Sequence, residues 1–97
     1  MEQKIKVTFF KRGEMKYISH LDLVRLFQRA ARRAGLPVTV TRGFTPRLKI
    51  SITRALKLGA ESNGEDAVFS MSKTLPPETF TRAINGKLPP DVQIINS

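Results

Sequence analysis

One stretch of the sequence carries clear signals for the start, the buried side and the end of a helix. Ser19 is a favourable N-cap, and Asp22 three residues later gives an acidic variant of the capping box. Gly35 suits the position just after a helix, and Pro37 prevents its continuation. The spacing predicts a helix over residues 20–34. Its apolar residues are Leu23, Phe27, Ala30, Ala31 and Ala34. Because the later residues of this set are alanines with small side chains, such a helix can lie close to a sheet.

Strands are predicted on both sides of this helix, because apolar residues alternate there with polar ones. In residues 4–10 the alternation puts Ile5, Val7 and Phe9 on the side that would be buried. In the same way Leu48 is expected to point inward and Lys49 outward. The further strands are predicted over residues 38–41, 48–53, 67–71 and 92–95.

A second helix is predicted to begin at Pro76 and Pro77, since proline is tolerated in the first turn of a helix. Its apolar residues are Phe80, Ala83, Ile84 and Leu88. The order β-α-β-β-β-α-β is closest to a ferredoxin-like sandwich, an α+β fold with two helices on one face of an antiparallel sheet. We expect the whole chain, residues 1–97, to form a single domain.

The opposite face of this sheet would stay open, and basic side chains are predicted to project there. The residues on or near it are Lys4, Lys6, Thr8, Phe10, Lys49 and Ser51. Only Phe10 could stack on a base, whereas an RNA-recognition motif uses two or three aromatic rings. A standard RNA-recognition motif is therefore rejected.

Basic residues are concentrated in the first part of the chain. Residues 1–57 hold 14 of the 17 lysines and arginines and three acidic residues, whereas residues 58–97 hold three basic and five acidic residues. Such an asymmetry indicates a localised positive surface, for which nucleic acid is the usual partner. An acidic protein partner or plain solvation remain alternatives. The residues expected to neutralise phosphates of tRNA or another structured RNA are Arg25, Arg29, Arg32, Arg33, Arg42, Arg47, Lys49 and Arg54.

Several of these candidates also have a structural interpretation. Arg32 and Arg33 would interact favourably with the dipole at the C-terminal end of the predicted helix. This interaction does not explain Arg25, which lies in the second turn of the helix. His20 would either help the helix cap or donate a hydrogen bond to a ligand. Phe44 would either pack or stack on a ligand.

Several functional classes are not supported. The chain has no cysteine and one histidine, so disulfides are excluded and neither a metal nor another cofactor is expected. No apolar run approaches the length of a membrane span, and no signal peptide is recognisable, so a cytoplasmic location is expected. Without an acid pair, a nucleophile–base pair or a phosphate-cradling glycine loop, catalysis by this chain alone is not expected. The oligomeric state is left open.

Three blocks of the sequence, taken in order, resemble a known family. They are SHLDLVRLFQRAARRAGLPV, GFTPRLKIS and LGAESNGED. The family is the radical SAM-linked domain of unknown function, found fused to or encoded beside radical SAM proteins in bacteria. The resemblance implies an accessory domain with a radical SAM partner. The family's turn usually reads close to GFNPHPRIS, where this chain has Thr45, Arg47 and Leu48, and the family domain is longer. The chain is therefore similar to its N-terminal half or to a short stand-alone member.

A fainter resemblance concerns the first half of two-domain tRNA pseudouridine synthases, which have a similar order of elements and a late helix ending in a Leu-Pro turn, as in AINGKLPPDVQII. Their nucleophilic aspartate follows the second strand, whereas the comparable residues 41–45 here contain no aspartate. The resemblance implies an RNA-binding shape without that chemistry. Three hypotheses follow: an RNA-binding accessory domain, a protein-interaction adaptor, and a degenerate or half-length RNA-modifying domain.

Overall fold

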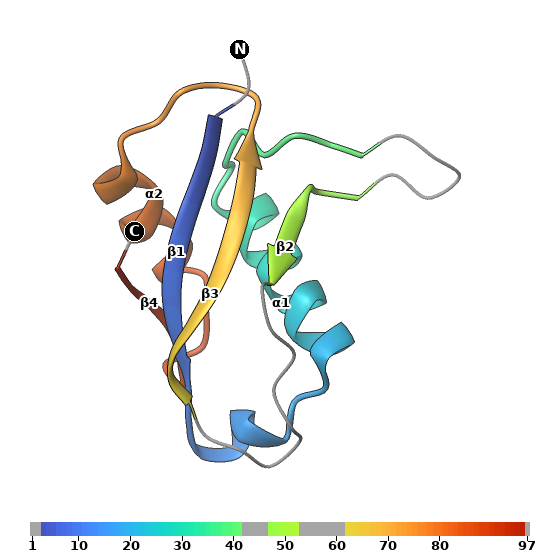
Figure 1. Cartoon of the computed structure of the whole chain (residues 1–97), viewed down its shortest axis with the longest axis vertical. Coiled ribbons are helices and arrows are strands. Elements are labelled where there is room, and N and C mark those ends of the chain that lie inside the picture. Colours follow the sequence, from blue (N-terminus) through green and yellow to red (C-terminus); the bar gives the residue numbers. More distant parts are fainter. Residues whose placement is uncertain (1–2, 42–46, 53–61, 97) are drawn as a thin grey trace.

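The structure of the chain is a computed structural model that describes residues 3–41, 47–52 and 62–96. Four antiparallel strands form one sheet in the order β2-β3-β1-β4, and both helices cover the same face of it (Figure 1). The elements are β1 (Gln3–Lys11), the 3₁₀ helix η1 (Gly13–Tyr17), α1 (His20–Arg33), β2 (Ile50–Ile52), β3 (Ser62–Met71), α2 (Pro77–Asn85) and β4 (Val92–Asn96). The ferredoxin-like α+β sandwich predicted from the sequence is confirmed.

Several of the predicted elements differ from those observed. Residues 38–41 form no strand, because they pair with β3 only at Val38 and with the 47–49 segment only at Val40. Thr39 stands between these partners, donating its N–H to Ser70 O at 2.7 Å and accepting from Lys49 N at 2.7 Å. The strand predicted over 67–71 begins earlier, at Ser62, and the strand predicted over 48–53 begins later, at Ile50, because Leu48 makes only an isolated bridge to Val40. The helix η1 was not predicted.

The ends of α1 follow the sequence signals. The Ser19 side chain accepts a hydrogen bond from the Asp22 N–H at 3.1 Å, which caps the first turn. At the other end Gly35 adopts a φ of +68°, where a side chain would be strained. The N–H groups of Gly35 and Leu36 then donate to the carbonyls of Arg32 and Ala31 at 3.1 and 3.0 Å. These two bonds form a Schellman motif that stops the helix.

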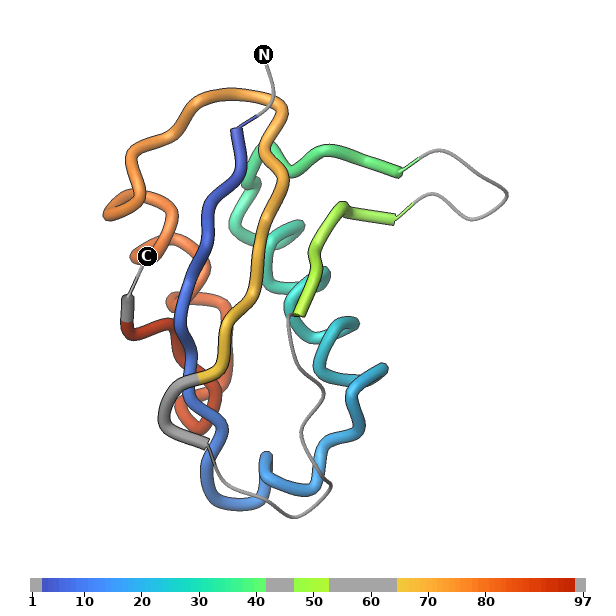
Figure 2. The backbone as a smooth tube through the Cα atoms, in the orientation of Figure 1, coloured from blue at the N-terminus to red at the C-terminus, as the bar shows by residue number. Residues whose placement is uncertain are grey.

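Both helices lie behind the sheet (Figure 2). A chain of four phenylalanine rings joins them to it. Phe27 of α1 meets Phe9 of β1 and Phe69 of β3, with ring centroids 5.0 and 5.8 Å apart. Phe69 in turn meets Phe80 of α2 at 4.8 Å. All three pairs are edge-to-face, the arrangement that ring quadrupoles favour. The four rings are fully buried and fix the position of each helix on the sheet.

The outer edge of β4 is partly capped by hydrogen bonds from the residues around the end of α2. The Asn85 side chain donates from Nδ2 to Ile94 O at 2.9 Å and accepts from Ile94 N at 2.8 Å, as a neighbouring strand would do. The N–H of Val92 donates to Pro89 O at 3.1 Å. Three polar backbone groups at this edge, the N–H and C=O of Ile94 and the N–H of Val92, are therefore satisfied within the chain, which disfavours pairing with another strand there.

Lys11 is a charged residue within the core. It is only 1% exposed and lies at the end of β1, on the same side of the sheet as Phe9. Desolvation lowers the pKa of Lys11 below its usual value of 10.5, while the negative charge of Glu65 partly opposes this change. The charged form of Lys11 therefore destabilises the folded state.

Replacing this lysine with an apolar side chain should stabilise the fold. Lys11→Met is expected to raise the free energy of unfolding at pH 7 by about 1 kcal/mol or more, because it removes the cost of burying an ammonium group. For the unsubstituted chain, unfolding binds a proton between the lowered pKa and 10.5, so its stability should rise with pH in that window. The advantage of Lys11→Met should shrink over the same range, as measured by urea unfolding at several pH values.

The matched control is Lys6→Met, at an exposed position of the same strand. It should change stability by less than about 0.5 kcal/mol, since surface substitutions and surface ion pairs contribute little. A Lys11→Met protein that is less stable than the unsubstituted chain at pH 7 would contradict the prediction.

Candidate nucleic-acid interface

A depression of about 490 Å³ lies beside β2 and is lined by three basic residues, Lys4, Arg47 and Lys49. Hydroxyl groups of Thr41, Ser51 and Ser70 also line it, and no acidic side chain is among its described lining residues. Its walls come from β1, β2, β3, α1 and the segments that precede and follow residues 42–46. We call it the β2-edge pocket. Its lining is suited to an anion with several oxygen acceptors.

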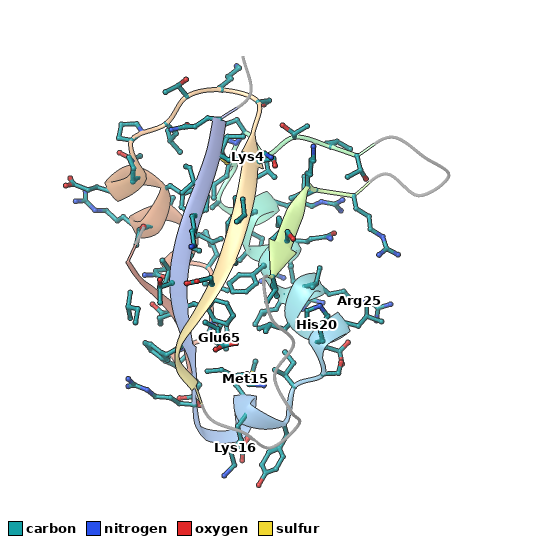
Figure 3. All side chains as sticks on the ribbon, in the orientation of Figure 1. Lys4, Met15, Lys16, His20, Arg25 and Glu65 are labelled. Atoms are coloured by element: carbon teal, nitrogen blue, oxygen red, sulfur yellow. The ribbon has the colours of Figure 1, made fainter. Side chains whose placement is uncertain are left out.

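Strand pairing builds the sheet side of this pocket. Lys4 of β1 lies opposite Ser70 of β3, and the Ser70 N–H donates to the Lys49 carbonyl at 3.0 Å. These three residues form a row across neighbouring strands, which we call the Lys4–Ser70–Lys49 row. Ser70 is only 4% exposed, while both lysines are exposed. Lys4 is seen beside the upper half of β3 in Figure 3, on the face that carries no helix. The row thus places a serine between two exposed lysines on neighbouring strands.

A second set of hydrogen bonds holds Arg47. The Thr41 N–H donates to the Arg47 carbonyl at 2.6 Å, and the Arg47 N–H donates to Thr41 Oγ1 at 3.1 Å. The backbone at Arg47 is therefore fixed while its side chain stays exposed at the rim of the pocket. The depression gains a guanidinium group, which can bind two oxygens of a phosphate at once.

Helix α1 contributes the other wall. Val24 and Gln28 line the pocket, and Arg32 follows at the same four-residue spacing along the helix. The outward side of α1 carries exposed arginines, which fall within an arc of about 100°; they are Arg25, Arg29, Arg32 and Arg33. The arginines of α1 therefore continue the positive surface past the β2 edge onto the helix side.

Two ion pairs reduce the charge at the borders of this surface. Arg25 pairs with Asp22 at 3.5 Å, and Lys6 pairs with Asp66 at 3.7 Å. Both pairs are solvent-exposed, so each lowers the local positive potential without fixing its partners strongly. Neither pair involves a residue of the β2-edge pocket.

The structure places the remaining candidates as follows. His20 is the exposed first residue of α1 and does not line the pocket; Figure 3 shows it near Arg25, away from Lys4. Arg42, Phe44 and Arg54 lie outside the described residues. The structure therefore does not test the predictions for these three residues.

Sequence reasoning did not select Lys4 or Ser70 as site residues. The alternation in residues 4–10 does put Lys4 on the open face, so part of the signal was present. The missing information was the pairing of Lys4 with Ser70, which joins residues far apart in the chain.

Metal binding and membrane insertion gain no support from the described residues. In them no cluster of three or more His, Cys, Asp or Glu side chains could hold a metal ion. The helices found there are also too short or too polar to cross a bilayer.

The fold and the β2-edge pocket define a small ferredoxin-like domain with a surface suited to anions. The chain belongs to a family described as uncharacterized protein conserved in bacteria, DUF2344, whose model matches residues 4–97. No curated protein and no solved structure matches the chain.

Anion binding at the β2-edge pocket can be tested with inorganic phosphate. In an NMR titration at low ionic strength, the amide signals of Lys49, Ser51 and Ser70 should shift more than those of α2, because the basic side chains surround them. Lys49→Ala should weaken the response, whereas Lys87→Ala, at an exposed position after α2, should leave it unchanged. Equal shifts on α2 and around the pocket would contradict a localised site.

Proposed function

We propose that this domain binds RNA through the β2-edge pocket and the exposed arginines of α1. The observation that carries the proposal is the lining of the pocket, where Lys4, Arg47 and Lys49 meet without an acidic neighbour among the described lining residues. Phosphate groups are the common biological anions that such a set of ammonium and guanidinium groups recognises.

The distribution of charge supports a polyanion rather than a single small anion. The basic residues continue from the pocket to Arg29 and Arg32 on α1, so the surface extends over several elements. A chain of phosphates can contact all of them together and release condensed counterions at each contact. The net charge of +9 adds long-range attraction to the same partner.

The resemblance to radical SAM-linked domains supplies the context of the proposal. It rests on the blocks at residues 19–38, 43–51 and 58–66. In this context the domain is an accessory module that presents RNA, such as tRNA, to a radical SAM or RNA-processing partner. The family description names no partner and no substrate.

A protein-interaction adaptor is the second candidate, and exposed apolar side chains favour it. Tyr17 and Leu21 are 60% and 48% exposed near the start of α1, and Ile95 is 54% exposed on β4. Scattered single residues of this kind are normal on a surface, so they support the adaptor less strongly than the pocket supports RNA. The half-length RNA-modifying domain gains no further support from the described residues.

Binding of a folded RNA such as tRNA, followed by fluorescence anisotropy, tests the proposal. The affinity should fall steeply with salt, and Arg47→Ala combined with Lys49→Ala should weaken it by about 10-fold or more. The slope of log affinity against log salt should also decrease by about one for each phosphate that the variant no longer neutralises.

The control is Arg82→Ala combined with Lys87→Ala, which removes the same number of charges from exposed positions in and just after α2. It should reduce affinity by less than about 3-fold. Absence of RNA binding at low salt, or equal decreases in affinity in both double variants, would refute the proposal. A partner that stays bound in a pull-down after nuclease treatment would favour the adaptor.

A further inference from the structure

The described part of the open sheet face has no row of aromatic rings for stacking bases. Phe10 is the aromatic residue of β1 on that face, and the Arg12 guanidinium carbon lies 4.0 Å from its ring centroid. The Phe10 ring is thus already covered by a cation. Tyr17 is exposed, but it belongs to η1, outside the sheet. Recognition of single strands usually relies on two or three rings that stack successive bases.

The Lys4–Ser70–Lys49 row offers instead the groups that hold one phosphate. Two exposed lysines lie on either side of a serine, and the serine hydroxyl can donate a hydrogen bond. Ser70 is 4% exposed, so its position is fixed by the strands around it rather than by a flexible side chain. Such a row is suited to contact a phosphate of a nucleic-acid backbone, and a phosphate contact does not distinguish one base from another.

The β2 edge has cations on both of its sides. The segments that end at Thr41 and begin at Arg47 lead away from the body of the sheet (Figure 1). On the sheet side lie Lys4 and Lys49, and on the helix side the arginines of α1 follow the pocket wall formed by Val24 and Gln28. A sheet edge with positive charge on two sides is complementary to a groove bordered by two phosphate backbones. The minor groove of A-form RNA is wide and shallow enough to accept it.

We infer that the RNA bound by this domain is double-helical and is recognised through its backbone, with the Lys4–Ser70–Lys49 row holding one phosphate. This inference rests on the proposed RNA binding and specifies the class of RNA. It assigns the α1 arginines to the opposite backbone of the same groove.

The test compares three RNAs with the full chain at low and moderate salt: a duplex of about 16 base pairs, a second duplex of unrelated sequence, and an unstructured single strand of the same length. Both duplexes should bind with affinities within about 2-fold of each other, and the single strand about 10-fold more weakly. Lys4→Ala combined with Lys49→Ala should weaken duplex binding by about 10-fold. Phe10→Ala should not weaken single-strand binding by more than about 2-fold.

A control variant and the pattern of outcomes distinguish failure of the double-helix inference from failure of the proposed RNA binding. Arg82→Ala combined with Lys87→Ala should leave duplex binding within about 3-fold, since both positions are exposed on the α2 side of the domain. If the single strand binds as tightly as the duplexes, or one duplex sequence is strongly preferred, the inference is wrong while RNA binding stands. If none of the three RNAs binds at low salt, the proposed function itself is wrong.

Discussion

The buried phenylalanine chain is the constraint on which the rest of the domain depends. Phe9, Phe27, Phe69 and Phe80 come from two strands and both helices, and each ring meets the next edge-to-face. Because strand side chains alternate, burying Phe69 turns Ser70 to the other face of the sheet. In β1 the burial of Ile5 likewise turns Lys4 outward. The apolar packing behind the sheet thus decides which polar groups meet at the β2-edge pocket.

Much of this fold could be predicted from local patterns, and the errors in the predicted strands have a common cause. The ends of α1 depend on short-range hydrogen bonds made by Ser19 and Gly35, so the sequence around them is sufficient. Residues 38–41 alternate like a strand, yet Thr39 bonds to two different segments and completes no ladder with either. The early start of β3 at Ser62 also depends on a long-range partner, since it continues along β1 past an irregularity near Lys11. Pairing between distant segments is not contained in a local pattern.

In the candidate site, too, some features follow from local sequence and others depend on pairing between distant segments. Arg47 and Lys49 could be chosen because basic residues are dense around them, and the structure brings both to one depression. Lys4 is distant in sequence from both and reaches them only because β1 pairs with β3. The arginines of α1 were expected to share a surface with them; they lie on the helix side, connected to the pocket through Val24 and Gln28. A residue's side of a strand or helix can be predicted locally, whereas its neighbours across the sheet cannot.

The amide of Asn85 has a consequence for how copies of this domain can assemble. The Asn85 amide binds both the N–H and the C=O of Ile94, so the β4 edge of the sheet is less available for pairing with another strand than the β2 edge. Growth of a fibre by strand addition needs two open sheet edges on every molecule, each presenting unpaired N–H and C=O groups. With the β4 edge partly capped in this way, strand pairing through β2 is expected to end after two molecules, so growth into open-ended polymers is disfavoured.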